Sequence, residues 1–89
     1  MLPHEFKAAR RSLVLDERGA ELYNRPKGSR VSQSLMGEIL GVKSSRTIRK
    51  WEDGDNDISG PAIVIMKAIS KVPEFRKWLG IAFNNEVEN

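Results

Sequence analysis

The sequence predicts an all-α domain, a compact bundle of about five helices, and three observations lead to this prediction. Apolar residues recur at three- and four-residue spacing in several separate segments, which is the period of an amphipathic helix. Serine, glycine and proline stand between these segments, where helices begin and end. The chain has 89 residues, enough for one domain. We assign residues 1–83 to that domain and expect residues 84–89 to form a frayed tail.

The first helix is expected from Pro3 to about Leu15. Proline suits the first turn of a helix, and apolar residues recur on one side from Phe6 onward. Residues 16–31 lack this period and read as an irregular insertion between the first two helices. A Pro-Lys-Gly-Ser turn signal lies near their end, so either short helical turns or a hairpin could form there.

Two short helices separated by a tight turn are expected next. Ser32 can cap the first, and Gly41 can end it. The apolar stripe between them consists of Leu35, Met36, Ile39 and Leu40. Ser44 can cap the second helix, which runs to Asp53 and carries Ile48 and Trp51 on its apolar side.

Two further helices complete the expected bundle. Pro61 begins a strongly apolar segment that reaches Val72, and Pro73 begins the last helix. The apolar face of that last helix consists of Phe75, Trp78, Leu79, Ala82 and Phe83. Either these helices simply close the core, or they form a symmetric interface. We expect a homodimer because a chain this short has little room to bury both apolar stripes. The residues assigned to the dimer interface are Phe75, Trp78, Leu79 and Phe83.

Charge is distributed unevenly along the chain. The net charge is +3, but residues 1–50 carry eleven basic and five acidic residues, whereas residues 51–89 carry four and seven. The sharpest change lies between the basic segment 43–50 and the acidic segment 52–57. A molecule with one basic end suits a polyanionic partner, although a solvated face would also explain the pattern.

The helix expected over residues 44–53 has two chemically different sides. At 100° per residue, Ile48 and Trp51 fall on the inner side. The outer side carries Ser45, Arg46, Arg49, Lys50 and Asp53. An α-helix with such a row of donors fits the major groove of DNA, where arginine can make two hydrogen bonds to guanine.

Several short motifs resemble the helix-turn-helix of the Cro and phage-repressor (XRE) family. They are Phe6-Lys7-Ala8-Ala9-Arg10, Ser32-Gln33, Met36-Gly37, Ile39-Leu40-Gly41-Val42, Ser44, Arg46-Thr47-Ile48, Trp51-Glu52-Asp53-Gly54 and Gly60-Pro61-Ala62. The resemblance covers roughly residues 3–15 and 32–70. It implies a lambda-repressor-like bundle that binds duplex DNA, commonly as a dimer that regulates transcription. The turn from Gly41 to Ser44 is one residue longer than usual in this family.

The resemblance also implies roles for individual residues. Arg10 and Glu52 occupy the places of a structural ion pair, and Gln33 would touch a phosphate and brace the recognition helix. Within the recognition segment we assign base reading to Ser45, Arg46, Arg49 and Lys50. Contacts that position the DNA backbone are assigned to Gln33, Lys43, Ser44 and Thr47.

The insertion ends with three basic residues beside a turn, Arg25, Lys27 and Arg30. They could form an extra arm that contacts phosphates, or the segment could be an ordinary surface loop.

Other classes of function find little support in the sequence. The chain has no cysteine and a single histidine, His4, so thiolate chemistry and a histidine metal cluster within one chain are excluded. The Asp53–Asp57 segment opens like a calcium loop, but Ile58 and Val64 stand where the loop needs glycine and glutamate. We therefore expect neither an enzyme nor a metal or other cofactor, and no membrane partner.

The function expected from the sequence is a cytoplasmic, sequence-specific transcriptional regulator. It would be a repressor or autoregulator that binds a pseudo-palindromic operator as a homodimer. Two alternatives stay open: the antitoxin of a toxin–antitoxin pair, which would bind a cognate toxin protein, and a protein-interaction module that has lost DNA binding.

Overall fold

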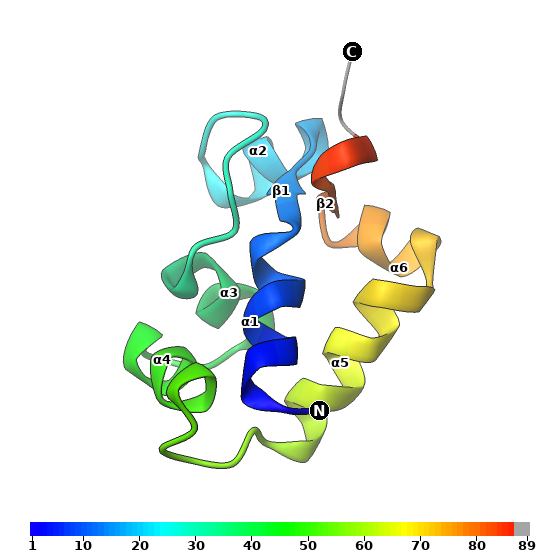
Figure 1. The fold of residues 1–89 in the computed structure, drawn as a ribbon. Coiled ribbons are helices and arrows are strands. Elements are labelled where there is room, and N and C mark those ends of the chain that lie inside the picture. Colours follow the sequence, from blue (N-terminus) through cyan, green and yellow to red (C-terminus); the bar gives the residue numbers. More distant parts are fainter. Residues whose placement is uncertain (87–89) are drawn as a thin grey trace.

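The computed structural model describes residues 1–86, which form six α-helices, two short strands and a closing turn of 3-10 helix (Figure 1). The elements in chain order are α1 (Pro3–Arg11), β1 (Leu13–Leu15), α2 (Glu17–Tyr23), α3 (Gln33–Leu40), α4 (Ser45–Asp53), α5 (Gly60–Lys71), α6 (Pro73–Trp78), β2 (Ile81–Phe83) and η1 (Asn84–Glu86). The fold is therefore compact and mostly helical, as expected, but it is not all-α. The radius of gyration is 12.2 Å, close to the value of about 12 Å for a compact chain of this length.

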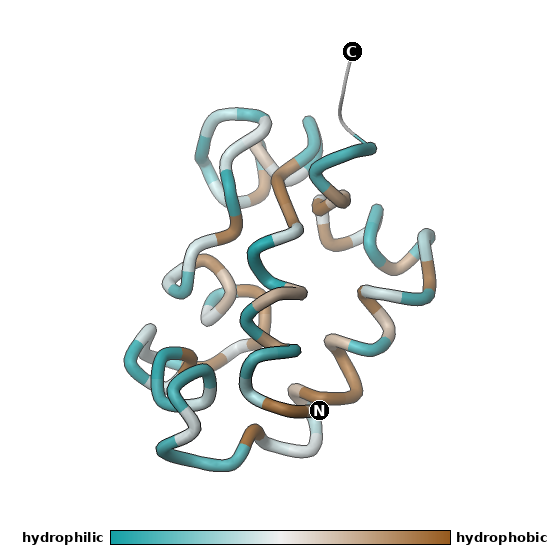
Figure 2. Tube along the Cα trace, in the orientation of Figure 1, coloured by the Kyte–Doolittle hydropathy of each residue, from teal (hydrophilic) through white to brown (hydrophobic). Residues whose placement is uncertain are grey.

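One hydrophobic cluster holds the helices together. Phe6 of α1, Leu35 of α3, Ile48 of α4 and Met66 of α5 are all fully buried in it. Apolar residues are concentrated along α5, whereas α4 and the segment that precedes α3 are mainly hydrophilic (Figure 2). No helix within residues 1–86 combines the length and the apolar character needed to cross a bilayer.

The first helix is shorter than the sequence indicates. It ends at Arg11, and Leu13–Leu15 form β1, which pairs in antiparallel fashion with β2 through Leu13 opposite Phe83 and Leu15 opposite Ile81. All three β1 residues are buried. A strand is recognised by alternating polar and apolar residues, and burial on both faces removes this alternation. In the sequence, Leu13–Leu15 therefore looks like the apolar end of the preceding helix.

The last helix is also shorter than expected. It ends at Trp78, and Gly80 then adopts a left-handed conformation with φ of 79°. This turn leads the chain into β2, which places Ala82 and Phe83 on a strand rather than on the helical face assigned to them. Of the residues assigned to a tail, Asn84–Glu86 form η1, and residues 87–89 lie outside the described part of the chain.

The insertion at residues 16–31 is ordered. Asp16 caps α2 by accepting a hydrogen bond from the Gly19 amide at 2.8 Å. Residues 28–31 then run along the free edge of β1, where the Leu15 amide donates to the Ser29 carbonyl at 2.9 Å. β1 thus has hydrogen-bonded neighbours on both sides, β2 on one and this segment on the other.

Candidate nucleic-acid interface

α4 begins and ends on local signals. The Ser44 hydroxyl accepts a hydrogen bond from the Arg46 amide at 3.1 Å, which caps the first turn. At the other end Gly54 has a φ of 80°, and its amide closes the last turn. The turn from α3 is made in the same way, since Gly41 is left-handed and the Val42 amide donates to the Gly37 carbonyl at 2.9 Å.

Two large side chains anchor the inner side of α4. Ile48 is fully buried, and Trp51 meets the Phe6 ring edge-on with 5.8 Å between ring centroids. The four residues assigned to base reading, Ser45, Arg46, Arg49 and Lys50, are all exposed. The outer side of α4 therefore presents a row of hydrogen-bond donors on a helix that cannot easily rotate.

A hydrogen-bond network fixes α4 against α1 and α3. The buried Glu52 carboxylate accepts from Arg10 twice, from Nε at 2.6 Å and from Nη2 at 3.0 Å. The Gln33 side-chain amide donates to the same carboxylate at 3.1 Å. Arg10 also donates through Nη1 to the Val31 carbonyl at 3.0 Å. The ion pair expected between Arg10 and Glu52 is thus present, and Gln33, at the start of α3, braces α4.

The residues assigned to backbone positioning surround the start of α4. Lys43 and Ser44 are exposed, and Thr47 is half-buried. Gln33 is half-buried and uses one amide N–H on Glu52, which leaves its second N–H for another acceptor.

Acidic residues adjoin the outer row at the end of α4. Arg49 Nε lies 3.7 Å from the Asp53 carboxylate one turn later, and both side chains are exposed. A shallow hollow of about 190 Å³ is lined by Arg46, Arg49, Lys50, Asp53 and Asp55. An exposed pair of this kind contributes little to stability, so Arg49 can leave Asp53 for a stronger partner at low cost.

The three basic residues assigned to an extra arm have different surroundings. Arg25 is half-buried and forms an ion pair with Glu38 of α3 at 3.0 Å. Lys27 is exposed in the turn after α2. Arg30 is exposed beside β1, where its Nη1 donates to the Arg11 carbonyl at 3.3 Å. Arg25 thus holds the insertion against α3, and the contact of an arm with phosphates stays a prediction.

The residues assigned to a dimer interface differ in exposure. Trp78 is 63% exposed and stacks on Phe75 with ring centroids 6.1 Å apart. Leu79 and Phe83 are half-buried and pack against the core, and the Arg76 guanidinium lies 4.3 Å from the Phe83 ring centroid. Trp78 is the member of this set that most clearly projects into solvent.

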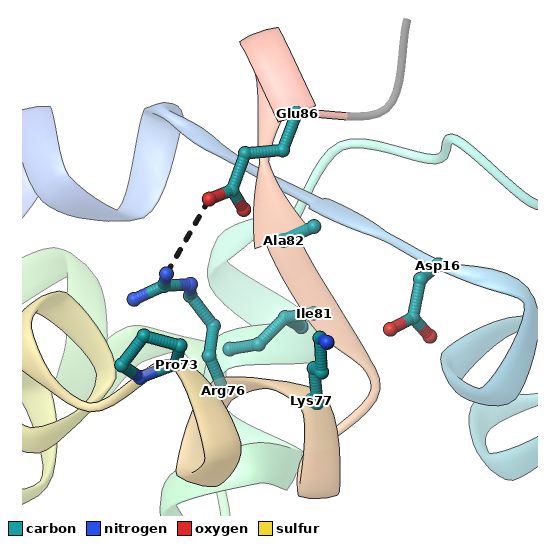
Figure 3. Close-up of a pocket in the computed structure, with 7 residues that line it drawn as sticks. All are labelled: Asp16, Pro73, Arg76, Lys77, Ile81, Ala82 and Glu86. Atoms are coloured by element: carbon teal, nitrogen blue, oxygen red, sulfur yellow. Dashed lines mark hydrogen bonds and ion pairs between the residues drawn. The ribbon is translucent and has the colours of Figure 1, made fainter. Parts of the chain in front are cut away.

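A cleft of about 430 Å³ lies between α6 and β2 (Figure 3). Its central cation is Arg76, which is buried and donates to the Ile69 carbonyl at 2.6 Å and to Glu86 at 3.4 Å. Asp16, on the opposite wall, caps α2. Since Arg76, Glu86 and Asp16 each bind other groups of the chain, we assign these three residues of the cleft a structural role.

Within residues 1–86, no three histidine, cysteine, aspartate or glutamate residues gather in a way that could hold a metal ion. The chain matches no protein-family model, no curated protein and no solved structure.

Proposed function

We propose that this chain binds duplex DNA in a sequence-specific manner, with α4 as the recognition helix of a helix-turn-helix formed by α3 and α4. The observation that carries the proposal is the exposed row Ser45, Arg46, Arg49 and Lys50 on a helix anchored by Ile48 and Trp51. A major groove about 12 Å wide admits an α-helix, and base edges there are read by just such donors.

Each residue of the row has a chemical task in this proposal. Arg46 and Arg49 can each donate two hydrogen bonds to the O6 and N7 atoms of a guanine. Ser45 can donate or accept at a base edge, and Lys50 can bind a base or a phosphate. Lys43, Ser44, Thr47 and Gln33 would bind phosphates and fix the register of the protein on the duplex.

The regulatory role follows from binding alone. A protein that occupies an operator prevents other proteins from using the same stretch of DNA, and this requires no further activity. We therefore propose a repressor or autoregulator of transcription that acts as a homodimer on a site with two-fold symmetry.

The test compares specific with random DNA. Duplexes selected from a random pool by the wild-type chain would supply the specific site. Arg46→Ala or Arg49→Ala should then cost about 1–3 kcal/mol on that site and broaden the sequence preference. Fluorescence anisotropy of labelled duplexes at one fixed salt concentration measures both effects.

Two controls separate base reading from general attraction. Lys43→Ala should weaken binding to specific and random duplexes alike, whereas Lys67→Ala, an exposed residue on α5, should change neither. Equal losses on specific and random DNA for both arginines would contradict the assignment of base reading. A wild-type chain without affinity for any duplex would refute the proposal and favour a protein-interaction module.

A further inference from the structure

One edge of α1 lies beside α4. A Cβ atom placed on Gly54, at the end of α4, would lie 3.8 Å from Pro3. Arg10, two turns along α1, binds Glu52 of α4. Lys7 follows Pro3 by four residues and precedes Arg11 by four, so all three share one ridge of α1. Lys7 and Arg11 are exposed, and on α1 they follow the edge whose Pro3 and Arg10 contact α4.

Arg30 extends this row beyond the end of α1. It lies opposite Val14 of β1, and its Nη1 donates to the Arg11 carbonyl at 3.3 Å. Because side chains alternate along extended backbone, Val31 is buried while Arg30 is exposed. We call Lys7, Arg11 and Arg30 the flanking basic stripe.

No member of the stripe forms an ion pair with any residue from 1 to 86. Arg10, Arg25 and Arg76, by contrast, each contact a carboxylate. Neighbouring like charges repel one another, so a stripe without internal neutralisation favours an external anion.

A surface hollow borders the stripe at Arg11. It has a volume of about 450 Å³ and is lined by Arg11, Ser12, Phe83, Asn84 and Asn85. The side-chain amides of Asn84 and Asn85 can donate hydrogen bonds to phosphate oxygens, and among residues 1–86 no acidic residue lines the hollow.

We infer that the flanking basic stripe is a second binding surface for phosphodiester groups, on the same duplex that α4 reads. This inference rests on the proposed function. The phosphates on either side of a major groove flank any helix that lies in it, so cations on α1, the helix packed against α4, can meet one backbone. The stripe adds affinity without adding sequence preference, because phosphates carry no sequence information.

Salt dependence of DNA affinity tests the inference. The probe is a short duplex of random sequence, titrated with the full chain between about 50 and 200 mM salt. A triple variant, Lys7→Gln, Arg11→Gln and Arg30→Gln, removes the stripe. The matched control, Lys67→Gln, Lys71→Gln and Lys77→Gln, removes the same charge from exposed positions on α5 and α6. Thermal unfolding monitored by circular dichroism shows whether both variants fold.

Each lost phosphate contact lowers the slope of log K against log salt by about 0.9, so the stripe variant should lose roughly 2 to 3 in slope. The control variant should keep the wild-type slope. Equal slopes for the two variants would overturn the stripe while leaving the proposed function intact. A wild-type chain that binds no duplex would overturn both the proposed function and the stripe.

Discussion

At the scale of single residues, Glu52 is the side chain on which the orientation of α4 depends. Its carboxylate is 1% exposed and accepts three hydrogen bonds, two from Arg10 and one from Gln33. We predict that Glu52→Ala lowers the free energy of unfolding by about 3–5 kcal/mol, because Arg10 would keep a buried charge without a counterion. Urea denaturation of the two proteins measures the difference.

A double-mutant cycle separates the energy of the Arg10–Glu52 ion pair from the packing contributions of the two side chains. Arg10→Met combined with Glu52→Met should cost less than the sum of the two single changes, because each single change leaves a buried charge without its partner and the double change leaves none. Gln33→Ala should cost only about 1 kcal/mol, because it removes a single hydrogen bond. Simple additivity at Arg10 and Glu52 would contradict the coupling that the geometry indicates.

Tyr23 links stability to pH through one phenol. Burial raises its pKa above the ordinary value of 10.0, against the opposing effect of nearby Arg18, while Glu38 and Asp16 raise it further. Its hydroxyl also donates to the Leu79 carbonyl at 2.7 Å, which ties α2 to the end of α6. A raised pKa in the folded state means that the stabilisation is present below the unfolded pKa and is lost as the pH rises above it.

We predict that wild-type protein is more stable than Tyr23→Phe by about 1 kcal/mol at neutral pH, the contribution of one hydrogen bond. This advantage should shrink as the pH rises past about 10, where the unfolded phenol ionises first. Paired urea titrations between about pH 7 and 11 measure it. An advantage that stays constant or grows across this range would show that Tyr23 does not carry the pH dependence.

At the scale of elements, α2 crosses the turn before β2 where two glycines meet. A Cβ atom on Gly19 would lie 2.0 Å from the Gly80 carbonyl oxygen, and Gly80 is itself left-handed. The turn at Gly80 cannot easily move away from α2, because the Asp16 amide donates a hydrogen bond to the Gly80 carbonyl oxygen at 3.0 Å. We predict that Gly19→Ala destabilises the fold by about 3 kcal/mol despite the better helix propensity of alanine.

Gly60 provides the matched control for this change. It also lies in a helix, as the first residue of α5, but among residues 1–86 no atom beyond its chain neighbours and its own helix backbone lies within 4 Å of a Cβ placed there. Gly60→Ala should therefore change the stability by less than about 0.5 kcal/mol. Similar melting temperatures for the two variants would contradict the close contact between α2 and the turn that precedes β2.

Local signals explain which elements could be predicted. α3, α4 and α5 each begin at a serine whose hydroxyl accepts from a backbone amide, and these three helices lie close to their expected positions. The outward row of α4 followed from helical period alone, since Ile48 and Trp51 define its inner side.

Contacts between distant segments explain what the sequence did not reveal. β1 pairs with a strand near the other end of the chain, and three residues are too few to show a period. The sequence did not reveal the ion pair of Arg25, which was assigned to an arm, because its partner Glu38 lies 13 residues away on another helix. Arg11 was not assigned to the candidate site at all, since its place beside Arg30 depends on the return of the chain along β1.

At the scale of the whole molecule, the exposed apolar groups suit a second copy of the chain. Trp78 projects from α6 close to α2, because Arg18 Nε donates to its carbonyl at 2.9 Å. Leu22, one turn after Arg18 on α2, is also more than half exposed. A dimer formed through this patch would carry two copies of α4, and a two-fold symmetric operator would then have half-sites about one helical turn apart.

We predict that wild-type protein sediments as a dimer at micromolar concentration and that Trp78→Glu sediments as a monomer, because a carboxylate cannot be buried there without a partner. Trp78 makes no side-chain hydrogen bond within residues 1–86, so the variant should keep the wild-type circular dichroism spectrum. Loss of the dimer should also weaken binding to a two-fold symmetric duplex far more than binding to a single half-site. In a dimer, once one α4 has bound its half-site, the second α4 is held at a high effective concentration near the other. If the wild-type protein sediments as a monomer, the dimer prediction is contradicted, and a symmetric operator is no longer expected. DNA recognition by α4 would then be tested on single half-sites.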